Sequence, residues 1–218
     1  PGYYATITKQ ILRDFEQIGK SIEDFGNISG LLIFTQIFKV VEALVSSTTF
    51  RFVLTMIKIG ANSVLFADFD LETAMRHIHL AGYDGIELAA IKGSEHLELE
   101  NWQAQVNQIK ELSQQYELEL LAMEVASLEE ERLMPAFAAG AEIGIPVVNI
   151  GSGGQSDVEE DLVRQVELVA EMAERAQEHG VTLCVKPHVG ACIYNTPTIL
   201  RAMEMVDSPA CGINMDPS

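Results

Sequence analysis

The chain has 218 residues, of which 48% are hydrophobic and 21% charged, and its 32 acidic and 14 basic side chains give a net charge of −18. This hydrophobic fraction excludes an intrinsically disordered chain, which combines low hydrophobicity with high charge. The acidic excess excludes general nucleic-acid binding, because such a surface needs clustered Lys and Arg to neutralise phosphates.

The charge divides the chain at Met56. Residues 1–55 contain five basic and five acidic side chains, so residues 56–218 contain the remaining nine basic and 27 acidic ones and carry the whole net charge. We therefore expect two unlike parts, a neutral segment over 1–55 and an acidic domain over 56–218.

Residues 1–55 are predicted to form an apolar helical extension of unknown origin. Apolar side chains recur every three or four residues over 1–27, and residues 28–45 are more apolar but contain Lys39 and Glu42. A membrane-spanning helix needs about 20 largely apolar residues, so this stretch is short for one. We prefer an extension with no part in the chemistry, and we expect any membrane contact to involve residues 28–45.

Three cysteines, Cys184, Cys192 and Cys211, lie near the end of the chain. Their odd number argues against a secreted domain held together by disulfides. Free cysteines fit a reducing compartment, so we expect a cytoplasmic protein in which these side chains pack as small hydrophobic groups.

From Met56 onward, short apolar runs alternate with longer helical patterns. The six strand candidates begin 28 to 34 residues apart, which is typical of repeated βα units. The candidates are residues 57–63, 85–90, 119–126, 147–151, 181–187 and 212–216. This alternation predicts parallel strands covered by helices.

Capping residues mark the helices between these strands. Asp70 is predicted to cap the first helix, and Gly144 to end a later one. Ser156 and Glu159 form an S-x-x-E pattern, which predicts a capping box. Pro197 is expected at the first position of the last helix.

Two architectures compete for such a chain, a doubly wound sheet and a (β/α)₈ barrel. The first strand is followed by NSVLFADFD, without the G-x-G-x-x-G pattern of a dinucleotide-binding sheet. Polar residues instead follow the C-terminal ends of the strands, where a barrel places its chemistry. The sequence predicts a TIM barrel truncated after about six βα units, and the resulting open edge predicts a homo-oligomer.

The segments MIKIGANSVLF, AGYDGIELAA, KPHVGACIYNTPT and GINMDPS resemble the xylose isomerase-like TIM barrels. That superfamily includes sugar phosphate isomerases and epimerases, tagatose and psicose epimerases, inosose dehydratase and endonuclease IV. The resemblance covers residues 56–218 and implies a sugar or polyol substrate. It also implies a divalent metal, Mn²⁺, Mg²⁺, Co²⁺ or Zn²⁺, that polarises a carbonyl while a proton moves at the adjacent carbon.

The resemblance suggests roles for individual residues. Asp216 matches a metal ligand after the sixth strand, and His188 is a candidate ligand or acid. Lys186 stands where the family usually has a metal-binding Glu, so it is expected to hold an anionic substrate group or to replace the charge of the metal. Glu87 matches a Glu near the substrate.

The glycine-rich run 151–154 precedes a helix, and its amides would favour a phosphorylated substrate.

The predicted function is a sugar or sugar phosphate isomerase or epimerase, with metal assistance. The catalytic candidates are Lys186, His188 and Glu87. The substrate-binding candidates are Asn62, Glu124 and Asn149, and the metal-binding candidates are Asp216 and His188. Two alternatives stay open: a Schiff-base lyase or aldolase that uses Lys186, and an inactive barrel fragment tethered to a membrane or partner.

Overall fold

The computed structural model describes residues 57–215, so the predicted extension over 1–55 and the candidate ligand Asp216 lie outside the described residues. Six parallel strands form one sheet whose order follows the sequence. They are β1 (Gly60–Asn62), β2 (Gly85–Ala89), β3 (Glu119–Glu124), β4 (Val147–Gly151), β5 (Thr182–Lys186) and β6 (Cys211–Ile213).

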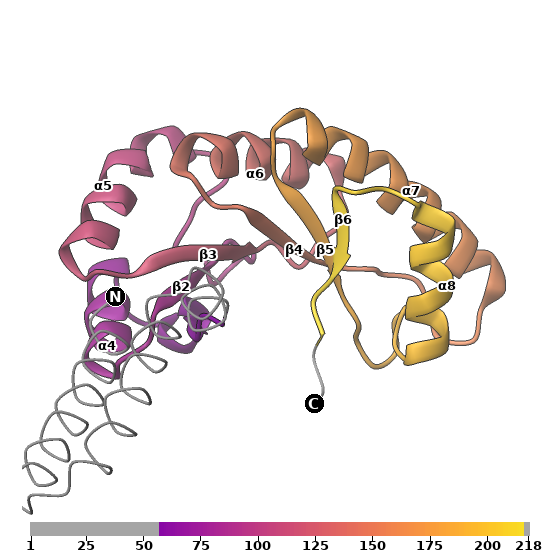
Figure 1. Ribbon diagram of the computed structural model, residues 1–218, viewed down its shortest axis with the longest axis horizontal. Helices are drawn as coiled ribbons and strands as arrows, with labels where there is room; N and C mark the ends of the chain where they lie inside the picture. The colour runs from indigo at the N-terminus through magenta and orange to yellow at the C-terminus, as the bar shows by residue number, and fades with distance from the viewer. Residues whose placement is uncertain (1–56, 216–218) are drawn as a thin grey trace, which may run out of the picture. The chain divides into compact units, whose positions relative to one another are not determined.

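A helix follows each of the first five strands. They are α4 (Leu71–Leu80), which a 3₁₀ helix over Ser63–Phe66 precedes, then α5 (Trp102–Gln115), α6 (Glu130–Ile143), α7 (Glu159–Glu178) and α8 (Thr196–Val206). The sheet is curved, and α5, α6 and α7 lie on its outer side (Figure 1). This is an α/β, TIM-barrel-like arrangement, which confirms the predicted fold class. Among the described residues the sheet is open, with β1 and β6 at its edges.

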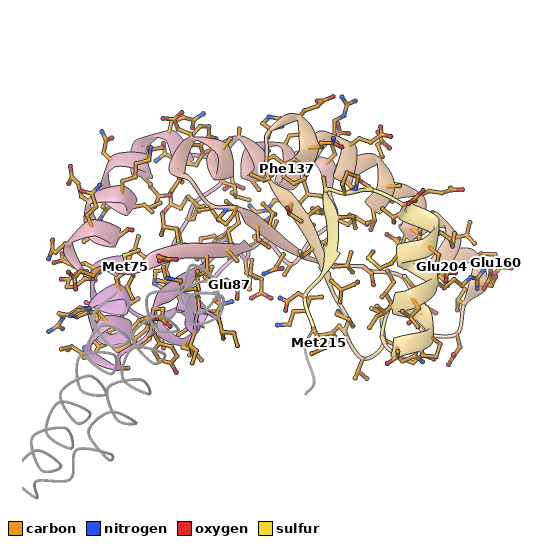
Figure 2. The ribbon with its side chains drawn as sticks, in the orientation of Figure 1. Met75, Glu87, Phe137, Glu160, Glu204 and Met215 are labelled. Carbon is orange, nitrogen blue, oxygen red and sulfur yellow. The ribbon has the colours of Figure 1, made fainter. Side chains whose placement is uncertain are left out.

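The hydrophobic core lies between the sheet and the helices. Ile86, Met123 and Val185 of the strands are inaccessible to solvent and belong to one apolar cluster with helix residues. Figure 2 shows two of these, Met75 of α4 and Phe137 of α6, on the helix side of the strands. Because the helix side is filled by apolar packing, the inner side of the sheet is available for chemistry.

The helix caps confirm some predictions and correct others. The Asp70 carboxylate accepts a hydrogen bond from the Thr73 amide at 2.7 Å, and Gly144 ends α6 with a φ of 94°, as expected. The capping box at Ser156 is wrong, because α7 begins only at Glu159, without a side-chain cap. The Ser156 amide instead donates to the carbonyl of Gly190, which ties it to a neighbouring loop.

The strand bounds agree with the predictions best in the middle of the sheet. Strand β4 has the predicted bounds, whereas β1 is shorter than expected and β6 begins one residue earlier and ends at Ile213. Between β2 and β3 the register shifts, since Ile86 pairs with Leu120 but Glu87 pairs with Ala122. Leu121 is therefore a bulged residue without a partner in this ladder.

Within residues 57–215, no helix is long and apolar enough to cross a membrane. The stretch predicted to allow membrane contact, residues 28–45, lies outside the described residues. The three cysteines are free, as expected, and Cys192 is buried.

Candidate active site

Five of the predicted site residues meet on the inner side of the sheet. They come from five consecutive strands and are Asn62, Glu87, Glu124, Asn149 and Lys186. We call this set the strand-end cluster, because three members are the last residues of their strands and the other two lie within two residues of a strand end. Figure 2 shows Glu87 on the concave side of the sheet, away from the helices. Parallel order brings these positions to one mouth, as the barrel prediction requires.

Asn62 joins two carboxylates. Its Nδ2 donates to Glu87 Oε2 at 2.9 Å and to Glu124 Oε2 at 2.5 Å. Its Oδ1 accepts a hydrogen bond from the Val64 amide at 2.9 Å, which caps the 3₁₀ helix and fixes the orientation of the side-chain amide. One asparagine therefore ends β1, begins the next helix and holds Glu87 close to Glu124.

Glu87 is the most strongly constrained carboxylate of the cluster. Its other oxygen, Oε1, accepts a hydrogen bond from Asn149 Nδ2 at 2.5 Å. Burial raises the pKa of Glu87 above its ordinary value, and the charge of Glu124 adds to this, while the amides of Asn149 and Asn62 oppose it. A carboxylate with a raised pKa takes up and releases a proton closer to neutral pH, which suits general acid–base catalysis.

Lys186 completes the cluster with a positive charge. Its Nζ lies 3.6 Å from Glu124 Oε1, and the two side chains are 32% and 12% exposed. The contacts thus run from Asn149 through Glu87, Asn62 and Glu124 to Lys186. A neighbouring carboxylate favours the charged ammonium form of a lysine.

The structure does not bring the other two predicted site residues into the cluster. His188 is exposed, and its ring Nδ1 lies 2.8 Å from the carbonyl oxygen of Val189 in its own loop. Asp216 lies outside the described residues. The roles given to His188 and Asp216 therefore stay predictions.

A cavity of about 370 Å³ lies beside the cluster, on the inner side of the sheet. Asn62, Glu87 and Asn149 line it, so three candidate residues face a space large enough for a small molecule. Leu121 and Cys184 also line it, and sequence reasoning missed both as parts of the site. The expectation of polar residues at strand ends does not select apolar side chains. The inward position of Cys184, two residues before Lys186, nevertheless follows from strand alternation.

The glycine-rich loop at 151–154, which was predicted to favour a phosphorylated substrate, packs against a neighbouring loop. Gly154 packs so closely on the next loop that an added Cβ would lie 3.0 Å from Cys192 Cβ. The Gln155 amide already donates to the Asp161 carboxylate at 2.9 Å. The Asp161 carboxylate therefore lies against the backbone just after the glycine-rich run, and its negative charge would repel a phosphate bound there.

Among residues 57–215, the donors at the strand-end cluster do not form a site for the divalent metal that the resemblance implies. Within residues 57–215, no group of three or more His, Cys, Asp or Glu side chains is placed to hold an ion. Glu87 and Glu124 are engaged by amide donors, and the Lys186 ammonium would repel a cation beside Glu124.

A family model and several solved structures match this arrangement. The model of the xylose isomerase-like TIM barrel family matches residues 75–218. The chain belongs to this family. The match confirms the resemblance drawn from the sequence motifs over nearly all of the acidic domain. Among curated proteins, none matches the chain significantly.

Three solved structures illustrate the shared fold. A D-psicose 3-epimerase studied with D-fructose is 15% identical, with a TM-score of 0.59 over 72% of this chain and 62% of that one. A D-allulose 3-epimerase from Methylomonas sp. is 19% identical, with a TM-score of 0.56 and the same coverages. A xylose isomerase-like protein from Mycobacterium smegmatis in complex with magnesium is 16% identical, with a TM-score of 0.60, over 73% of this chain and 64% of that one. The chain spans less than two thirds of each.

Proposed function

We propose that the chain is part of an enzyme that isomerises or epimerises a sugar by moving a proton next to a carbonyl. The observation that carries the proposal is Glu87, a carboxylate with a raised pKa that two asparagines hold at the edge of a cavity. The fold shared with two sugar 3-epimerases supports the same class of reaction.

In this reaction Glu87 acts as the proton-transfer group. It takes a proton from the carbon beside the carbonyl and returns it to the same or the neighbouring carbon, which gives the epimer or the isomer. Asn62 and Asn149 orient both of its oxygens, which keeps the carboxylate in one position. We favour an unphosphorylated sugar, because the Asp161 carboxylate lies against the Gln155 amide, directly after the glycine-rich run that was the candidate phosphate site.

The remaining predictions accompany this proposal. A divalent metal stays a prediction that rests on Asp216 and His188. A cytoplasmic location and a homo-oligomer likewise stay predictions. Of the alternatives, the Schiff-base lyase needs a neutral Lys186 amine, which the ion pair with Glu124 disfavours. The proton-exchange assay described below tests the other alternative, an inactive fragment tethered to a membrane or partner.

The experiment is a proton-exchange assay in D₂O. The chain is incubated with D-fructose, D-allulose and D-tagatose, and ¹H NMR follows deuterium incorporation next to the carbonyl. We expect exchange with at least one sugar and a loss of about 10²-fold or more in Glu87→Gln, the range typical of a general acid or base. Glu142→Gln, a matched change at an exposed position of α6, should exchange like the unmodified chain. Absence of exchange with every sugar contradicts the proposal.

A further inference from the structure

Lys186 places a positive charge beside the carboxylates of the strand-end cluster. It is the last residue of β5, and its ammonium lies 3.6 Å from Glu124 on the inner side of the sheet. The side chain is about one third exposed, so a ligand at the mouth can reach it. The strand-end cluster thus contains two carboxylates and one ammonium, and the ammonium is its electrophilic group.

The carboxylate oxygens of the cluster face nitrogen donors. Glu87 Oε1 and Oε2 accept hydrogen bonds from Asn149 and Asn62, respectively. Glu124 Oε2 accepts from Asn62, and its Oε1 faces Lys186. A divalent cation bound to either carboxylate would share it with such a donor, and at Glu124 it would also approach the ammonium. The cluster is therefore organised around N–H groups instead of a metal ion.

We propose that Lys186 takes the part of a divalent cation in this site: its ammonium donates a hydrogen bond to the sugar carbonyl and stabilises the oxyanion that forms. The inference rests on the proposed function for its reaction. Glu87 removes the proton, the C–H electron pair forms a carbon–carbon double bond, and the carbonyl π pair moves onto oxygen. The oxygen becomes an enediolate oxyanion held by Lys186, which keeps its own protons, and reprotonation at carbon reverses these movements.

A metal titration tests the inference without an activity measurement. Free Mn²⁺ is measured by EPR while the ion is added to the chain, to Lys186→Glu and to Lys186→Met. We expect Lys186→Glu to bind Mn²⁺ at least about 100-fold more tightly than the unmodified chain, because it removes a repelling charge and adds a ligand. Lys186→Met should lie between the two, since it removes only the charge. Lys110→Glu on α5 makes the same change in net charge outside the cluster and should leave Mn²⁺ binding unaltered.

The exchange assay provides the second measurement. The chain should keep its deuterium exchange after dialysis against EDTA, and Lys186→Met should lose about 10²-fold or more in kcat. Tight Mn²⁺ binding by the unmodified chain that Lys186→Glu does not improve would overturn the assignment. Loss of exchange in EDTA with recovery on addition of Mn²⁺ would also overturn it. If no sugar exchanges, the proposed function fails, while the Mn²⁺ titration still decides whether Lys186 excludes a metal.

Discussion

Replacing Gly85 by alanine should destabilise the protein more than replacing Gly60, although these glycines are paired across β1 and β2. A Cβ on Gly85 would lie 2.5 Å from the carbonyl oxygen of Glu119 and 2.6 Å from Leu121 Cγ. A Cβ on Gly60 would lie 2.7 Å from Leu121 Cδ1 and 3.2 Å from the carbonyl oxygen of Gly85. The end of a leucine side chain can rotate away, whereas a carbonyl within a sheet cannot.

The expected magnitudes follow from this difference. Overpacking a protein interior typically costs about 1–3 kcal/mol. Gly85 is buried and meets backbone, so we expect Gly85→Ala to lower the free energy of unfolding by about 3 kcal/mol. Gly60 is exposed and meets a side-chain end, so Gly60→Ala should cost about 1 kcal/mol. Combining Gly60→Ala with Leu121→Ala should remove most of its overpacking cost, while the same combination should rescue Gly85→Ala only in part.

Urea denaturation followed by circular dichroism gives these values for the single and double variants. The comparison requires an unchanged m value, because a changed slope would indicate an altered unfolded or folded state. Coupling with Leu121→Ala is read as a double-mutant cycle. Equal losses for Gly85→Ala and Gly60→Ala, or full rescue of Gly85→Ala by Leu121→Ala, would refute the argument from the Glu119 carbonyl.

Two further predictions concern pH and capping. Because the pKa of Glu87 is raised in the folded state, the stabilising contribution of its protonated form is present below the ordinary pKa of 4.5 and is lost as pH rises through the folded value. The urea midpoint of Glu87→Gln should therefore rise relative to that of the unmodified chain as the pH increases from 4 to 8. Asn195 caps α8 by accepting from the Thr198 amide, so Asn195→Ala should cost about 1 kcal/mol. Asn101→Ala, at the start of α5 where no side-chain cap is made, should cost less than about 0.5 kcal/mol by the same measurement.

The sequence predicted the fold from the period of its βα units, and the errors lie where local patterns meet tertiary contacts. Strand β4, with neighbours on both sides, has the predicted bounds. Strand β1 has one neighbour among the described strands, so its ladder ends sooner than its apolar run. The S-x-x-E pattern at Ser156 failed because the loop is held by Gly190 and by the Asp161 carboxylate, which no local pattern reveals.

The candidate site was only partly predictable for a related reason. The expectation that polar residues gather at strand ends selected all five members of the strand-end cluster. Their contacts could not be predicted, because Asn62 meets Glu87 and Glu124 from 25 and 62 residues away along the chain. His188 met the same positional criterion, yet it lies in the loop beyond β5, where its ring turns toward Val189.

The bulge at Leu121 determines which side chains of β3 reach the site. In a ladder without the shift, Leu121 would stand opposite Glu87. Leu121 and Met123, two residues further along β3, would then both face inward. The extra residue reverses this alternation beyond Leu121, so that Met123 is buried in the core and Glu124 faces Asn62 and Lys186. One inserted residue thus exchanges a thioether for a carboxylate at the mouth, because without the register shift Met123 would stand opposite Ala89 in the place of Glu124.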